Sequence, residues 1–117
     1  MNTTNYELVR EELVKKHPLI LGGRGWPGVG DGWLPIIDKL CTAIQARIVE
    51  KQLPQLQAMQ IKEKYGGLRF YHNVNYDDFN DLVEAAEAEA ETTCDVCGKP
   101  GTLGGKYWLA TRCEEHT

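Results

Sequence analysis

Residues 59–74 read MQIKEKYGGLRFYHNV, in which two runs of alternating apolar and polar residues flank a pair of glycines. Alternation at every second residue is typical of a β-strand with one buried face. Gly66 and Gly67 suit a two-residue turn of the mirror-image type, because the central residues of that turn adopt positive φ. The stretch therefore predicts an antiparallel β-hairpin with its turn at residues 66–67.

A turn at this position determines which residues face each other across the hairpin. It predicts the pairs Tyr65–Leu68, Lys64–Arg69, Glu63–Phe70, Lys62–Tyr71 and Ile61–His72. The inward face would carry Met59, Ile61, Tyr65, Leu68, Phe70 and Val74. The outward face would carry Gln60, Lys62, Lys64, Arg69, Tyr71 and Asn73. We call four residues of the outward face the basic face: Lys62, Lys64, Arg69 and Tyr71.

The segments on either side of the hairpin have the periodicity of helices or the composition of loops. A helix is expected from about residue 5 to residue 17, ended by Pro18. A central helix is expected over residues 34–51, where apolar residues recur at intervals of three and four. An acidic, alanine-rich segment at 77–92 predicts a last helix. Residues 22–33 are too rich in glycine for a helix or strand and predict a structured loop.

Helices around a hairpin define an α+β fold. At 117 residues, of which 42% are hydrophobic, the chain has the length of one domain. We expect an α+β core over residues 1–92 and a metal-binding module that resembles a zinc ribbon or treble clef over 93–117, packed as one unit. No stretch is apolar over the roughly 18 to 20 residues that a membrane span needs.

Cys94, Cys97, Cys113 and His116 have the spacing C-x-x-C followed by C-x-x-H. Two such pairs can supply three sulfurs and one nitrogen to a tetrahedral structural zinc ion. A disulfide pair in a secreted chain and an iron site are the alternatives. The N-terminal residues lack the basic region and apolar core of a signal peptide, which favours metal-bound thiols in a reducing cytoplasm. Cys41 lies in an apolar helical stretch and is expected to be a small buried hydrophobe.

The charge of the chain is unevenly distributed. The net charge is −4, yet residues 1–75 carry ten Lys and Arg against seven Asp and Glu, while residues 76–117 carry three against ten. The overall acidity argues against general nucleic-acid binding, whereas the basic part could meet a small anion. The acidic run Glu84, Glu87, Glu89 and Glu91 also fits a solvated helix face.

The basic face is the candidate ligand site, because Arg offers a fork of donors, Lys a point charge and Tyr a hydroxyl or a stacking face. The loop adds Arg24 and Trp26, and its glycines would permit an anion to approach the backbone. Trp26 and Trp33 could stack on a base. The loop matches neither a phosphate-binding loop nor the dinucleotide fingerprint. A solvated hairpin face and tryptophans buried in the core are the alternatives.

Catalysis receives little support from the sequence. His17 precedes Pro18 and is expected at the surface, and His72 is expected at a strand end. Neither has a recognisable nucleophile as a sequence partner. We therefore expect a protein that is not an enzyme.

Several segments together resemble a family of small, uncharacterised phage and prophage proteins. They are GDGW at 30–33, LC at 40–41, KEKYGGLRFY at 62–71, TCDVCGKPG at 93–101, Trp108, TRC at 111–113 and His116. The resemblance covers roughly residues 20–117 of the chain. It implies a phage-encoded accessory protein of the bacterial cytoplasm and carries no catalytic residues to transfer.

The expected function is that of a non-enzymatic, zinc-stabilised protein that binds a small anionic ligand and sequesters it, for instance a nucleotide signal of host defence. The alternative is a protein–protein interaction module, in which the zinc end and the acidic helix bind and inhibit a host protein. Nucleic-acid binding ranks below both.

Overall fold

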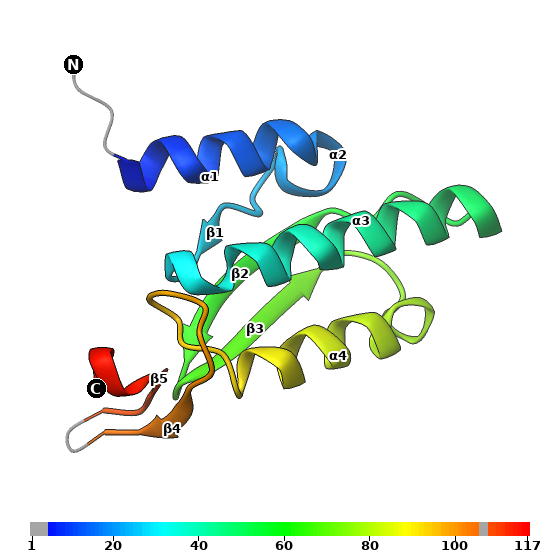
Figure 1. Ribbon diagram of the computed structural model, residues 1–117. Helices are drawn as coiled ribbons and strands as arrows, with labels where there is room; N and C mark the ends of the chain where they lie inside the picture. The colour runs from blue at the N-terminus through cyan, green and yellow to red at the C-terminus, as the bar shows by residue number, and fades with distance from the viewer. Residues whose placement is uncertain (1–4, 106–107) are drawn as a thin grey trace.

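The computed structural model describes residues 5–105 and 108–117. Its elements confirm the α+β class and are, in order, α1 Asn5–Lys16, α2 Pro18–Leu21, β1 Pro27–Gly28, η1 Asp31–Trp33, α3 Leu34–Lys51, β2 Ala58–Lys64, β3 Gly67–His72, η2 Tyr76–Asp78, α4 Asn80–Ala90, β4 Thr102–Gly104, β5 Ala110–Arg112 and η3 Glu114–His116 (Figure 1). The central helix has the bounds that the sequence predicts. The last helix begins later, because Phe79 at φ −134° separates it from the short turn η2.

The principal sheet has three strands in the order β1-β2-β3. β2 and β3 form the expected antiparallel hairpin, while β1 lies parallel to β2 on its other edge. Pro27 pairs with Ile61, and Gly28 pairs with Lys62. The glycine-rich segment is therefore not a loop throughout, because part of it adds a strand to the sheet.

The predicted pairing of the hairpin is wrong in its register. Lys64 pairs with Gly67, and Lys62 pairs with Arg69, so the turn is formed by Tyr65 and Gly66. Both turn residues have positive φ, 53° for Tyr65 and 82° for Gly66, as the mirror-image turn requires. Gly67 does not have positive φ and belongs to the strand.

Moving the turn by one residue shifts the pairing by two, so most side chains keep their predicted faces. Ile61, Leu68 and Phe70 are buried inward as expected. Two inward predictions are wrong: Tyr65 is 72% exposed because it forms the turn, and Met59 is 36% exposed because the register shifts between Ala58 and Gln60. Ala58 takes the buried place in β2.

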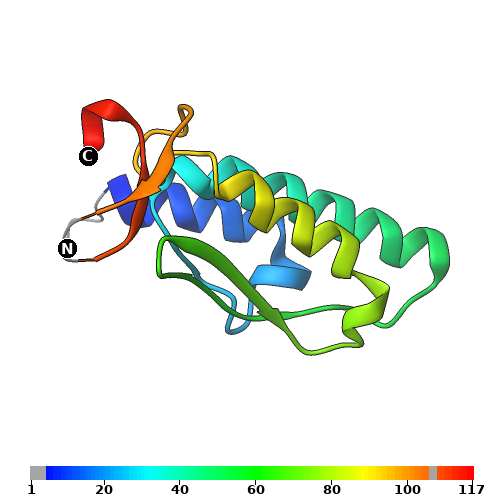
Figure 2. The ribbon, with the colours of Figure 1, turned by 90° about the horizontal axis from the view of Figure 1, so that it is seen from below.

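The core lies between the sheet and helices α3 and α4, which run along one side of the β2–β3 hairpin (Figure 2). Trp33, Ile37, Ile44 and Phe79 are completely buried there. Cys41 is also fully buried, as predicted, and burial raises the pKa of its thiol to about 12. It therefore packs as a hydrophobe and stays protonated.

A buried arginine joins α1 to the segment around β1. Arg10 is 0% exposed, its Nε donates a hydrogen bond to the carbonyl oxygen of Pro27 at 3.1 Å, and its guanidinium also donates to the carbonyl of Val29. Its Nη1 donates to Asp31 Oδ1 at 2.8 Å. The ring of Tyr6 lies 3.5 Å from the guanidinium carbon. These contacts satisfy a charge that would otherwise be costly to bury.

Candidate metal centre and basic face

The first cysteine pair lies in a tight turn that follows α4. Gly98 N donates to the carbonyl oxygen of Cys94 at 2.9 Å, and Gly98 adopts φ 82°, which glycine tolerates without strain. The amide of Cys94 donates in turn to Lys99 O at 2.7 Å. This closed turn holds Cys94 and Cys97 on one side of the backbone.

The second pair comes from the other end of the module. Cys113 directly follows β5, and His116 lies in η3, where its amide donates to Cys113 O at 3.1 Å. The amide of Asp95 donates to Thr111 O at 3.0 Å, which brings β5 beside the first turn. The module thus consists of the first cysteine turn, the β4–β5 hairpin and the short helical turn η3, which carries His116.

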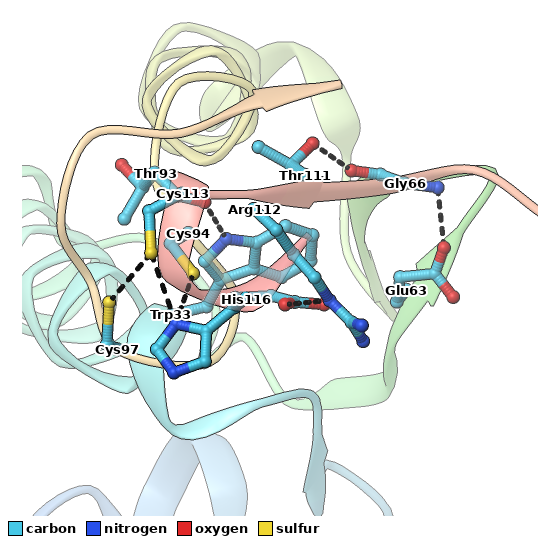
Figure 3. A network of polar contacts seen from close by, with 11 residues as sticks. Trp33, Glu63, Gly66, Thr93, Cys94, Cys97, Thr111, Arg112, Cys113 and His116 are labelled. Atoms are coloured by element: carbon cyan, nitrogen blue, oxygen red, sulfur yellow. Dashed lines mark hydrogen bonds and ion pairs between the residues drawn. The ribbon is translucent and has the colours of Figure 1, made fainter. Parts of the chain in front are cut away.

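The four ligand atoms converge on one point, with all of them within 4.8 Å of one another. Cys97 Sγ lies 3.6 Å from Cys113 Sγ, and His116 Nδ1 lies 3.6 Å from Cys94 Sγ and 3.1 Å from Cys113 Sγ (Figure 3). A tetrahedral zinc about 2.3 Å from sulfur and about 2.0 Å from nitrogen implies edges of roughly 3.5 to 3.8 Å. The cluster could therefore hold a metal ion.

The environment of the cluster favours a thiolate at Cys94. Burial alone would raise its pKa, but the backbone amides of Cys113, Cys97 and Val96 and the Cys113 thiol lower it to about 6. The pKa of Cys113 is raised, first by burial and then by the neighbouring cysteines. The thiolate of Cys94 thus offers a cation a negatively charged sulfur.

The metal-binding module is bonded to the core at two places. Trp33 Nε1 donates to Thr93 O at 2.8 Å, and Gly32 N donates to Asp95 O at 2.9 Å. On the other side, the buried Thr111 hydroxyl donates to the carbonyl oxygen of Gly66 at 2.7 Å, in the turn of the hairpin (Figure 3). The module therefore contacts both the end of the glycine-rich segment and the tip of the β2–β3 hairpin.

Contacts of this kind give Gly25, Gly30 and Gly32 a role in packing, whereas, apart from its chain neighbours, none of the described residues lies within 4 Å of a Cβ built at Gly23. A Cβ at Gly30 or Gly32 would lie 2.0 Å from a backbone oxygen of the first cysteine turn, so these glycines accommodate the metal module. A Cβ at Gly25 would lie 2.6 Å from Ala58 Cβ, so this glycine permits close packing on β2. Gly66, in the turn of the hairpin, is buried.

Three members of the basic face lie together on the outward side of the hairpin. Lys62 and Arg69 are direct cross-strand partners, and Lys64 pairs with Gly67 one position nearer the turn. A methyl group on Gly67 would stand 2.8 Å from Arg69 Nη1, so the guanidinium lies over Gly67, the cross-strand partner of Lys64. Tyr71 is the partner of Gln60 and is 37% exposed on the same side.

Of the residues expected to line a site in the glycine-rich segment, Trp26 and Arg24 are exposed and Trp33 is buried. Trp26 is 43% exposed and precedes buried Pro27, so alternation along β1 places it on the side of Lys62. Arg24 is exposed and lies outside the residues that pair β1 with β2. Trp33 is 0% exposed and belongs to the core, as the structural alternative held.

The histidines also differ from expectation. His17 Nε2 lies 2.6 Å from Asp38 Oδ1 and its side chain is only 8% exposed, so it is not a surface residue. His72 is 5% exposed, stacks on Tyr76 with ring centroids 4.1 Å apart, and has an Nε2 without a hydrogen-bond partner among the described residues. Burial lowers the pKa of His72. Neither His17 nor His72 belongs to the cluster of potential metal ligands found among the described residues.

Sequence reasoning missed the contacts of Arg10 and Thr111. Arg10 lies on the polar side of the helical pattern, which is normally exposed, and Thr111 is one of many threonines, so neither carried a signal in the sequence.

Comparison of the chain with protein-family models, curated proteins and solved structures gives no match. None of the helices in the described part of the chain is long and apolar enough to span a membrane.

Proposed function

We propose that this chain is a non-enzymatic, zinc-stabilised protein that binds a small anionic ligand on its basic face. One observation carries the proposal: Lys62 and Arg69 are direct cross-strand partners. Like charges opposite each other destabilise a hairpin unless an opposite charge lies near. Within residues 5–105 and 108–117, none of the ion pairs involves Lys62, Lys64 or Arg69. Arg69 interacts through its charge with the half-buried carboxylate of Glu87, and Lys64 Nζ lies 5.8 Å from the centre of the Tyr65 ring, but no carboxylate of the described residues lies in salt-bridge contact with either cation.

A bound phosphate would relieve this repulsion. Arg69 uses one N–H on the carbonyl of Leu68, at 3.1 Å, and its fork has further donors for an anion. Lys62 and Lys64 add point charges from the adjacent strand. The Tyr71 hydroxyl is a possible hydrogen-bond donor at the margin of the same face.

Zinc is the metal that the donor set favours, because three cysteines and one histidine match structural zinc sites. Four protein ligands leave no position for water or substrate, so the ion would stabilise the fold. The ion would hold the module that packs on the hairpin turn and so support the strands that carry the basic face.

The resemblance to small phage and prophage proteins gives this binding activity a biological setting. A phage accessory protein in the bacterial cytoplasm could sequester a nucleotide signal of host defence. Binding without turnover would be enough for that role.

Isothermal titration calorimetry with inorganic triphosphate at low ionic strength tests the proposal. The wild-type protein should bind it, and Arg69→Ala should weaken binding at least about tenfold, as expected for loss of a charged hydrogen bond. Lys15→Ala, on the exposed side of α1, removes a positive charge elsewhere and should leave binding unchanged. Equal affinity of wild type and Arg69→Ala would refute the site.

A protein–protein interaction module is the second candidate, and one surface favours it. The metal-binding module exposes Trp108 by 72% and Leu103 by 55%, with Leu109 and Val96 also exposed. A cavity of about 240 Å³ lies between Trp108, Arg112 and His116. In this alternative, the module and acidic α4 would bind a host protein.

Ionic strength separates the two candidates. Anion binding through half-exposed cations should weaken steeply with salt, because screening acts over about 8 Å at physiological ionic strength. An apolar protein interface around Trp108 should depend little on salt. Affinity measured from about 20 to about 500 mM salt distinguishes them.

A further inference from the structure

The cations of the outward side form a row that crosses the three strands. Gly28 of β1, Lys62 of β2 and Arg69 of β3 are partners in register, and Lys64 lies one row nearer the turn. Gly28 brings no side chain, and a Cβ built there would meet only Ile61 O, at 3.1 Å. The place beside Lys62 on β1 is therefore free of protein side chain.

The neighbouring row is aromatic. Gln60 of β2 pairs with Tyr71 of β3, and Trp26 extends the row on the β1 side, because the next residue, Pro27, pairs with Ile61. Trp26 is 43% exposed and Tyr71 is 37% exposed, so both rings present surface to solvent while part of each is supported by the protein. Gln60 lies between them and offers both a donor and an acceptor.

Neighbouring rows of side chains on one face of a sheet are two residues apart along each strand, or about 6.7 Å. A nucleotide has a similar separation between its base and its 5′-phosphate. We infer that the ligand is a nucleoside phosphate, with its base on the row of Trp26 and Tyr71 and its phosphates on Lys62 and Arg69. The inference rests on the proposed function and adds the class of ligand and its orientation.

The arrangement also gives the ligand a direction. The cations continue toward the turn through Lys64, and the Arg69 guanidinium lies near Gly67, the partner of Lys64. Phosphates beyond the first would therefore point toward the turn and meet Lys64. Affinity should rise from nucleoside monophosphate to triphosphate, and Lys64 should account for much of the rise.

A free nucleotide fits this face better than a strand of nucleic acid. Strand-binding proteins use successive aromatic platforms along an extended basic groove, whereas this face has one aromatic row bordered by cations. The net charge of −4 would also repel an extended polyanion.

The experiment compares ATP, AMP and inorganic triphosphate by calorimetry on the full chain with its metal bound. We expect ATP to bind at least about tenfold more tightly than triphosphate, since stacking of a base on an aromatic ring has about that effect. Replacing both rings, in Trp26→Ala with Tyr71→Ala, should abolish that difference. Trp108→Ala removes an exposed tryptophan of the metal module and should not change it. Lys64→Ala should reduce the preference for ATP over AMP.

The outcomes separate this inference from the proposed function. Equal affinity for ATP and triphosphate, unchanged by loss of both rings, would overturn the nucleotide assignment and leave anion binding intact. Failure of ATP, AMP and triphosphate to bind would overturn both. Tighter binding of a single-stranded trinucleotide than of ATP would overturn the assignment to a free nucleotide. Circular dichroism and the metal content of each variant establish that it is folded.

Discussion

The buried hydroxyl of Thr111 donates a 2.7 Å hydrogen bond to the carbonyl oxygen of Gly66. These residues are far apart in the sequence, one in β5 of the metal-binding module and the other in the turn of the β2–β3 hairpin. The bond joins the candidate metal centre to the strands of the basic face. Several consequences of this arrangement can be measured.

Thr111→Val should lower the free energy of unfolding by about 1 to 3 kcal/mol, because it leaves the Gly66 carbonyl without its partner at similar side-chain volume. Urea denaturation followed by circular dichroism measures the change. Thr102→Val, at an exposed position of β4, is the matched control and should have little effect. Equal stability of the Thr111 variant and wild type would mean that the bond does not support the turn.

Substitution of the two hairpin glycines tests the position of the turn. Gly66→Ala should destabilise the protein by about 1 to 3 kcal/mol, because φ is 82° and the new methyl would lie 3.3 Å from the backbone of Ala110. Gly67→Ala should cost less than about 1 kcal/mol, because its closest neighbour is the movable end of Arg69, at 2.8 Å. A larger loss at Gly67 than at Gly66 would instead support the turn at 66–67.

Removal of the metal should destabilise the whole protein. A strong chelator should reduce the free energy of unfolding by at least about 3 kcal/mol, since the binding energy of a structural ion contributes to folding. The melting temperature should fall by roughly 10 °C or more.

Cys113→Ser should lose the ion and reproduce the effect of the chelator. Cys41→Ala, at the buried cysteine outside the cluster, should retain one metal ion per chain even though it creates a cavity. Native mass spectrometry counts the ion in each variant. Retention of the metal by Cys113→Ser would contradict the assigned ligand set.

His72 should make stability depend on pH. Its pKa in the folded protein lies below the ordinary value of 6.5 because it is buried. Below pH 6.5 the unfolded chain therefore binds a proton that the folded chain resists, and stability falls as pH falls toward the lowered pKa. Above pH 6.5 the histidine is neutral in both states and contributes no slope.

His72→Leu removes this titration, so the difference in unfolding free energy between wild type and variant should change between pH 7.5 and pH 5. Taking the difference cancels the pH dependence of the metal ligands, which both proteins share. Chemical denaturation at several pH values measures it. A difference that is constant across this range would show that burial does not oppose protonation of His72.

The sequence predicted what depends on local pattern. Helix α3 begins and ends where expected, because Pro35 fits its first turn and its apolar residues follow helical spacing. The cysteine and histidine spacing predicted the cluster, because the ligands of each pair are close in sequence. The outward orientation of Lys62 and Arg69 followed from strand alternation and survived the error in register.

What the sequence did not predict depends on contacts between distant segments. Either Tyr65-Gly66 or Gly66-Gly67 could form the turn, and the observed turn places Gly66 against Leu103 and Thr111 of the module. Gly30 and Gly32 allow the backbone of the first cysteine turn to approach closely, which the composition of the glycine-rich segment does not predict. The pairing of β1 with β2 likewise has no local signal.

Strand β1 reaches β2 only after the chain has crossed through the whole of α3, so the two are joined by a helical crossover and not by a turn. Closing such a long connection is entropically costly, and the pairing contributes few hydrogen bonds to offset it. The edge that carries Trp26 is thus joined to β2 by a short pairing, and bonds from Arg10 to Pro27 and Val29 hold it from the side of α1. A ligand that contacts both Trp26 and Lys62 would connect β1 to β2. The protection of β1 amides from hydrogen exchange would then rise as the ligand site is filled.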